Sequence, residues 1–132
     1  MAIRKVVIHS DGVSRSNPGP AAIGATIKDK QGRMLATISR SIGRATNNQA
    51  EYRAVIAALE KAIELGAQQV ELNLDSELVV RQVTGRYRVK NQTLKPLFAE
   101  VQKLLDSFES SKIRHVPRRL NREADRLANS AL

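Results

Sequence analysis

The spacing of hydrophobic residues predicts three strands at the start of the chain. Residues 6–8 form a short apolar run that is typical of a strand buried on both faces. Turn-forming residues fill 13–20, and two β-like segments follow at 21–29 and 33–42. The short connection between these two segments contains a glycine, which predicts a hairpin. We therefore expect the first three strands to form an antiparallel meander.

Helical spacing begins after the meander. The polar residues 46–48 are candidate caps for a helix that ends at Leu65, before Gly66. Further along, the pattern predicts a strand at 70–74, a short helix at 76–84, an amphipathic helix at 93–108, a strand at 112–116 and a last helix capped by Asn121. Strand–helix–strand connections in this part of the chain indicate that the later strands are parallel. The order of elements predicts an α/β fold with a mixed sheet.

The length and charge of the chain narrow its class. Its 132 residues fit a single domain spanning 1–132, and 22 Lys and Arg against 13 Asp and Glu give a formal charge of +9. Such a basic domain favours a polyanionic partner, with nucleic acid ahead of a membrane surface. The lack of cysteine excludes disulfides and thiolate metal sites. Because no secretory or membrane-spanning apolar run is present, we expect a cytoplasmic protein.

Four carboxylates occupy positions that suggest one site. Asp11 ends the first predicted strand, Asp75 ends the fourth, and Glu51 lies near the start of the long helix. A right-handed crossover through that helix would place the first and fourth strands side by side and parallel. Their carboxyl ends would then bring these three side chains to one rim of the sheet, where ligands usually bind. Asp125, in the last predicted helix, would close the cluster.

Each carboxylate also has a purely structural interpretation. Glu51 would complement the helix dipole, and Asp75 would cap the next helix. Asp125 would pair with Arg122 or Arg126. These interpretations explain less well why several strand and helix ends converge. A cluster of carboxylates needs a cation to offset the repulsion between them. Oxygen ligands favour Mg²⁺ or Mn²⁺, and a pair of such ions suits phosphodiester cleavage.

Four sequence motifs follow one another along the chain. They are Asp11-Gly12 with Asn17-Pro18-Gly19-Pro20, then Thr46-Asn47-Asn48-Gln49-Ala50-Glu51, then Leu74-Asp75-Ser76, then His115-Val116-Pro117-Arg118 with Asn121 and Ala124-Asp125-Arg126-Leu127-Ala128. In these motifs the sequence resembles type 1 ribonuclease H, and the match keeps the same order over almost the whole chain. The likeness is strongest to the short forms common in archaea and some bacteria.

This resemblance implies both a fold and a reaction. The expected fold is ribonuclease H-like, an α/β fold whose five-stranded mixed sheet has three antiparallel and then two parallel strands, flanked by helices. The expected reaction hydrolyses the RNA strand of an RNA–DNA hybrid and leaves 5′-phosphate and 3′-hydroxyl ends. The family carboxylates fall on Asp11, Glu51, Asp75 and Asp125, which would hold two Mg²⁺ or Mn²⁺ ions. The alternatives are a non-catalytic hybrid-binding module and a related nuclease that acts on branched DNA.

The resemblance also implies residues that contact the hybrid. Polar side chains that match the family and are candidates for the minor groove are Asn17, Thr46, Asn47, Asn48 and Gln49. Basic side chains that would replace a larger basic protrusion of the bacterial enzymes are Arg81, Arg86, Arg88 and Lys90. The structural alternative for these basic side chains is a solvated charged surface. We expect a monomer with no obligate protein partner.

Two departures from the bacterial enzymes concern the site. Those enzymes carry a mobile glycine- and histidine-rich loop whose histidine aids product release, whereas residues 114–121 of this chain read RHVPRRLN. Both Arg118 and His115 are candidates for that catalytic role, and Arg118 is the preferred one because it matches the short forms. Glu77 stands where the bacterial enzymes often have glutamine, and its charge would either weaken substrate binding or point elsewhere.

Overall fold

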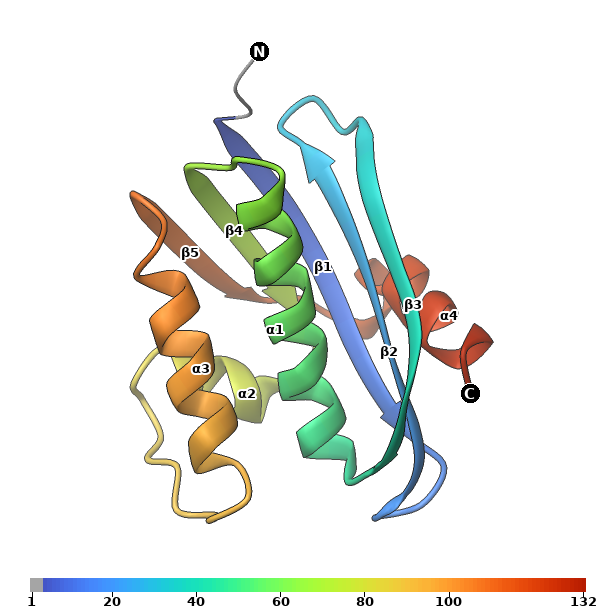
Figure 1. Ribbon diagram of the computed structural model, residues 1–132. Coiled ribbons are helices and arrows are strands. Elements are labelled where there is room, and N and C mark those ends of the chain that lie inside the picture. The colour runs from blue at the N-terminus through green and yellow to red at the C-terminus, as the bar shows by residue number, and fades with distance from the viewer. Residues whose placement is uncertain (1–3) are drawn as a thin grey trace.

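The computed structural model describes residues 4–132, and its central element is a five-stranded sheet with the strand order β3-β2-β1-β4-β5 (Figure 1). The strands are β1 (Lys5–Ser14), β2 (Gly19–Asp29), β3 (Met34–Ala45), β4 (Gln69–Leu74) and β5 (Ser110–His115). The pairs β1–β2 and β2–β3 are antiparallel, whereas β1–β4 and β4–β5 are parallel. This confirms the predicted meander and the predicted mixed sheet.

Helices cover the two faces of the sheet unequally. The helices are α1 (Asn47–Glu64), α2 (Glu77–Val83), α3 (Lys95–Leu105) and α4 (Arg122–Ser130), and a short 3₁₀ turn, η1 (Arg118–Leu120), precedes α4. Figure 1 shows α1, α2 and α3 in front of the sheet and α4 behind it. The helix α4 packs mainly on β1, β2 and β3. In the described part of the chain, none of the helices has the length and apolar character needed to cross a membrane.

The core between the sheet and α1 is built almost entirely from aliphatic side chains. Ile8, Leu59 and Leu72 are fully buried there, and Tyr52 is the one aromatic residue among the largest buried side chains. The Tyr52 hydroxyl donates a hydrogen bond of 2.7 Å to Oε1 of Gln82, which satisfies the polar end of that side chain. This packing holds α1 and α2 in fixed positions on the sheet.

The start of α1 follows the sequence prediction closely. Thr46 is the N-cap, and its hydroxyl accepts a hydrogen bond of 3.1 Å from the backbone N–H of Gln49. The side chain of Gln49 returns the interaction by accepting from the backbone N–H of Thr46 at 2.8 Å. This reciprocal capping box anchors the first turn of the helix.

The prediction that Asp11 ends the first strand is wrong, because β1 continues to Ser14. The parallel pairing of β1 with β4 does end just before Asp11, at the pair Ser10–Leu74. The antiparallel pairing with β2 continues, and Asp11 lies opposite Gly24 in it. Asp11 is therefore paired with β2 on one side of β1. On the side of β4 it lies just past the last paired residue.

Candidate active site

Three carboxylates meet at the carboxyl ends of the central parallel strands. Asp11 from β1, Glu51 from α1 and Asp75 immediately after β4 each offer one oxygen, and these oxygens all lie within 4.8 Å of one another. Asp11 and Glu51 are buried, and Asp75 is half-buried. The structure therefore brings together three of the four carboxylates that the sequence singled out.

Gly12 explains why α1 can approach β1 so closely at this point. A Cβ atom built on Gly12 would lie 2.1 Å from the carbonyl carbon of Ala50 and 2.3 Å from the backbone nitrogen of Glu51. Only glycine leaves room for the helix backbone there. This close approach places Glu51 directly beside Asp11.

The structural interpretations of Glu51 and Asp75 are wrong. The first turn of α1 contains no acidic residue, because Glu51 lies beyond it. The cap of α2 is Ser76, whose hydroxyl accepts from the backbone N–H of Val79 at 3.2 Å, so Asp75 is not used as a cap. Both carboxylates are therefore available for another role.

Crowding and burial make the cluster difficult to ionise. Burial raises the pKa of Asp11 from 3.8 to about 7, and the neighbouring carboxyl groups of Asp125 and Asp75 contribute to the rise. The pKa of Glu51 is raised well above its usual range, first by burial and then by the charge of Asp11. Burial also raises the pKa of Asp75, although a hydrogen bond from Asn121 and the charge of Arg118 oppose this. Buried oxygens that repel one another in this way fit a hard divalent cation, which would stabilise the ionised forms.

Asp125 lies at the edge of the cluster rather than among the three closest oxygens. Its carboxyl group contributes to the raised pKa of Asp11. Its Oδ1 atom accepts a hydrogen bond of 3.1 Å from Nδ2 of Asn129. Within residues 4–132, Asp125 has no ion pair with Arg122 or Arg126 shorter than 4.0 Å, so the proposed structural pairing is absent there.

Asn121 connects the elements that carry the carboxylates. The sequence predicts this residue as a helix cap, but its side chain makes no capping hydrogen bond. Instead, Nδ2 donates to the carbonyl oxygen of Ser10 at 2.9 Å, next to Asp11, and the side chain also acts to lower the pKa of Asp75. Because asparagine is common at helix starts, the sequence suggested only a cap at this position. The bond to Ser10 could not be predicted, since the two residues are far apart in the sequence.

The carboxylates open into a hollow of about 300 Å³ that also contains one basic residue. Its lining residues are Asp11, Gly12, Val13, Asn47, Glu51, Asp75, Ser76 and Arg118. His115 lies outside this hollow and instead lines a second one, with Glu77, Arg81 and Arg86. The structure thus separates the two candidates for the catalytic role and places only Arg118 beside the carboxylates.

The predicted minor-groove residues lie around the start of α1. Oδ1 of Asn17 accepts a hydrogen bond of 3.0 Å from the backbone N–H of Asn47, which joins the β1–β2 turn to the helix. Thr46 and Gln49 are engaged in the capping box, and Asn48 is half-buried. Of these five residues, Asn47 lines the carboxylate hollow itself.

The predicted basic contacts lie on an exposed loop after α2. Arg86, Arg88 and Lys90 belong to the part of the chain between α2 and α3, and all three are exposed. Arg81 is paired with Glu77 at 2.5 Å and also lies over the ring of Tyr87, 5.1 Å from its centre. The charge of Glu77 is therefore neutralised within α2.

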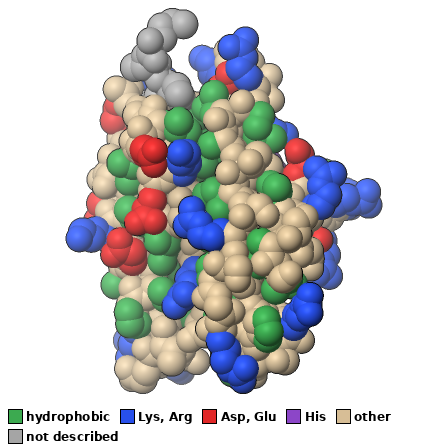
Figure 2. All heavy atoms as spheres, turned by 45° about the vertical axis from the view of Figure 1, so that its right-hand side comes forward, with side chains coloured by type: hydrophobic (Ala, Val, Ile, Leu, Met, Phe, Trp, Pro, Cys, Tyr) green, Lys and Arg blue, Asp and Glu red, His purple; other side chains and the backbone are tan. Residues whose placement is uncertain are grey.

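Positive charge is spread over much of the surface. In the view of Figure 2, Lys and Arg side chains lie at the upper end, along the right side and over the lower end, and the acidic side chains lie above the lower end. A surface with this excess of positive charge suits a polyanionic partner.

The fold and the carboxylate cluster define the ribonuclease H-like class of proteins. A family model described as reverse transcriptase-like matches residues 9–131. Ribonuclease HI of Halobacterium salinarum is 46% identical over 128 residues, which are 97% of this chain and 64% of that protein. A bifunctional protein of Mycobacterium tuberculosis is 47% identical over 129 residues, which are 97% of this chain and 35% of that protein. The chain therefore spans only about a third of the mycobacterial relative and just under two thirds of the halobacterial one.

Solved structures agree with these relatives. The N-terminal RNase H domain of the mycobacterial protein superposes with a TM-score of 0.94 and 48% identity, covering 96% of this chain and 98% of that one. LC11 RNase H1, solved in complex with an RNA/DNA hybrid, superposes with a TM-score of 0.91 and 43% identity, covering 96% and 95% of the two chains. The chain belongs to the type 1 ribonuclease H family, as its motifs predict.

The raised pKa of Asp11 predicts how the stability of the metal-free protein depends on pH. Without metal, the protein is expected to become less stable as the pH rises from about 4 to about 7, because the folded state holds a proton on Asp11 that the unfolded state has already lost. A contribution of about 2–4 kcal/mol is expected. Denaturant unfolding in a chelator, repeated for Asp11→Asn, would measure it. The variant is expected to lose clearly less stability over this interval, and an identical pH dependence would contradict the account.

Proposed function

We propose that this chain hydrolyses the RNA strand of RNA–DNA hybrids in a reaction that depends on divalent metal ions. The observation that carries the proposal is the meeting of Asp11, Glu51 and Asp75 within 4.8 Å, just past the end of the parallel pairing of β1 with β4, in a chain of this family. Its relative LC11 RNase H1 was solved with an RNA/DNA hybrid, which supports the choice of substrate. The expected products carry a 5′-phosphate and a 3′-hydroxyl.

The carboxylates are proposed to hold two metal ions, Mg²⁺ or Mn²⁺. Asp11, Glu51 and Asp75 would supply the buried oxygens, and Asp125 would supply a ligand at the edge of the cluster. Two such ions supply a hydroxide nucleophile at neutral pH and stabilise the leaving 3′-oxygen. The protein's own contribution is to hold four carboxylates from separate parts of the chain in one place.

The neighbouring side chains are proposed to position the hybrid. Asn17 and Asn47, joined by their hydrogen bond, offer amide groups beside the carboxylates, where they can meet 2′-hydroxyl groups in the minor groove. Thr46, Asn48 and Gln49 would shape the same surface. Glu51 would additionally contact the 2′-hydroxyl of the cleaved nucleotide, which would make the reaction selective for RNA.

The basic loop is proposed to bind phosphates of the hybrid without reading its sequence. Arg86, Arg88 and Lys90 are exposed and free to follow the backbone. Such contacts release counterions, so binding should weaken strongly between low and physiological salt. Residues 1–132 are proposed to form one domain, and cytoplasmic location and a monomeric state stay predictions of the sequence.

The proposal is tested with one labelled RNA strand presented in three forms. The strand is incubated with Mg²⁺ or Mn²⁺ as a hybrid with DNA, as single-stranded RNA and as an RNA duplex. Cleavage of the hybrid alone, with 5′-phosphate ends on the products, would support the proposal. Tight binding of the hybrid with no cleavage under either metal would favour the non-catalytic binding module, and cleavage of branched DNA in preference to the hybrid would favour the related nuclease.

Arg118 is expected to contribute more to catalysis than His115. Arg118→Ala should lower the cleavage rate about 10²-fold, because Arg118 lines the carboxylate hollow and its charge acts on Asp75. His115→Ala should change the rate by less than about threefold, which is under ~1 kcal/mol of barrier. Single-turnover rates on the hybrid provide the comparison, and Arg118→Lys should recover part of the loss. A larger defect in His115→Ala than in Arg118→Ala would reverse the assignment.

A further inference from the structure

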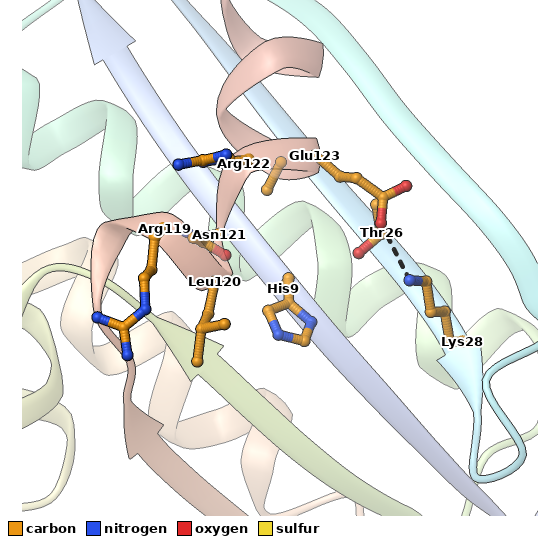
Figure 3. Close-up of a pocket in the computed structure, with 9 residues that line it drawn as sticks. His9, Thr26, Lys28, Arg119, Leu120, Asn121, Arg122 and Glu123 are labelled. Carbon is orange, nitrogen blue, oxygen red and sulfur yellow. Dashed lines mark hydrogen bonds and ion pairs between the residues drawn. The ribbon is translucent and has the colours of Figure 1, made fainter.

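A third hollow lies behind the sheet, beside the start of α4 (Figure 3). Its volume is about 310 Å³, at the lower end of the range for small-molecule sites. The lining comes from β1, β2, η1 and α4, and it consists of His9, Thr26, Lys28, Arg119, Leu120, Asn121, Arg122, Glu123 and Ala124. It shares no residue with the carboxylate hollow. The η1 turn separates the two, with Arg118 lining one and Arg119 the other.

The side chains around this hollow carry more positive than negative charge. Nζ of Lys28 lies 3.0 Å from Oε1 of Glu123, so these two charges neutralise each other. Arg119 and Arg122 are exposed, and among residues 4–132 neither has a carboxylate within 4.0 Å. His9 is half-buried and lines the same hollow. Arg119 and Arg122 therefore give the lining of this hollow an excess of positive charge.

The hollow also has an unsatisfied acceptor and an apolar rim. Asn121 is 1% exposed, its Nδ2 atom is fixed by the carbonyl of Ser10, and its Oδ1 atom has no hydrogen-bond partner. Figure 3 shows Asn121 between Arg119 and His9, at the inner wall. Leu120 is 56% exposed and forms an apolar part of the rim. Cationic, apolar and acceptor groups thus surround one small space.

We propose that this hollow binds a nucleoside monophosphate, either free or as the 5′-phosphorylated end of a nucleic acid strand. Arg119 and Arg122 would bind the phosphate, since the guanidinium fork matches phosphate oxygens. Leu120 would pack against the sugar or base. The wall formed by Asn121 and Thr26 would supply polar contacts. Inorganic phosphate alone would leave the apolar rim unused, and a nucleoside alone would leave the arginines unused.

The proposal is tested by titrating the ¹⁵N-labelled protein and following its amide resonances by NMR in a chelator. The probes are AMP, adenosine, inorganic phosphate and a 5′-phosphorylated dinucleotide. AMP is expected to bind more tightly than adenosine or phosphate and to shift the resonances of residues 26–28 and 119–124. Equal binding by the dinucleotide assigns the hollow to strand ends, and binding of AMP alone assigns it to free nucleotides. Shifts centred on Asp11, Glu51 and Asp75 would overturn the proposal.

A matched pair of double variants separates a site from general basic charge. Arg119→Ala with Arg122→Ala should weaken AMP binding about tenfold or more, because both phosphate contacts are lost. Arg33→Ala with Arg40→Ala removes the same charge from exposed positions elsewhere and should leave AMP binding unchanged. Equal effects of the two pairs would overturn the proposal. Cleavage of the hybrid by the Arg119/Arg122 pair should stay within about twofold, so a failure of this inference is distinct from a failure of the proposed activity.

Discussion

Asp75→Asn is expected to abolish hybrid cleavage while the protein stays folded. The substitution keeps the shape of the side chain but removes one of the three charges that face each other within 4.8 Å. Metal ions in such sites contribute several kcal/mol to catalysis, so a loss of at least about 10³-fold in rate is expected. Single-turnover cleavage of a labelled hybrid under saturating Mg²⁺ measures this effect.

The same substitution should stabilise the protein in the absence of metal. Asp75 contributes to the raised pKa of both Asp11 and Glu51, so its removal relieves repulsion between buried groups. Thermal unfolding in a chelator should show an unchanged or higher midpoint. Asp106→Asn, on an exposed position at the end of α3, is the matched control and should alter neither rate nor stability. A variant at Asp75 that cleaves at the normal rate would remove the basis of the proposed mechanism.

Gly12→Ala is expected to destabilise the fold by about 3 kcal/mol or more. The added Cβ would lie 2.1 Å from a backbone atom of Ala50, and backbone cannot move aside as a flexible side chain can. To relieve the clash, α1 would have to shift away from β1. Denaturant unfolding measures the loss, which should be accompanied by weaker metal binding because Glu51 moves with the helix.

A second glycine provides the control for this prediction. Gly66, just after α1, has a φ of +82°, and a Cβ atom added to it would have no other atom within 4 Å. Gly66→Ala should therefore lower the free energy of unfolding only by the strain of a left-handed backbone, roughly 1–2 kcal/mol. A loss for Gly12→Ala no greater than that for Gly66→Ala would show that the close approach of α1 to β1 is not what fixes the site.

Local pattern was sufficient to predict most of the elements. The capping residues before α1, the glycine after it and the apolar spacing of α3 are all signals contained within a few residues, and the structure agrees with them. The convergence of Asp11, Glu51 and Asp75 could also be anticipated, because a right-handed crossover leaves few places for the ends of β1 and β4.

Local sequence patterns could not predict the contacts between distant parts of the chain. The continuation of β1 past Asp11 depends on pairing with β2, which its own residues do not specify. The side chain of Asn121 bonds to Ser10, 111 residues away, although its position before a helix suggested a cap. The separation of Arg118 from His115 likewise depends on how η1 turns after β5. In each case the deciding partner lies on a different element.

We propose that the carboxylate cluster makes this chain a metal-dependent nuclease for RNA–DNA hybrids. The most direct test is a time course of cleavage of one labelled hybrid by the unmodified protein, with Mg²⁺ or Mn²⁺ added and then removed by a chelator. Cuts in the RNA strand should begin when metal is added and stop when the chelator is added. Hybrid that remains bound but intact with either metal, or cleavage that continues in the chelator, would contradict the proposal.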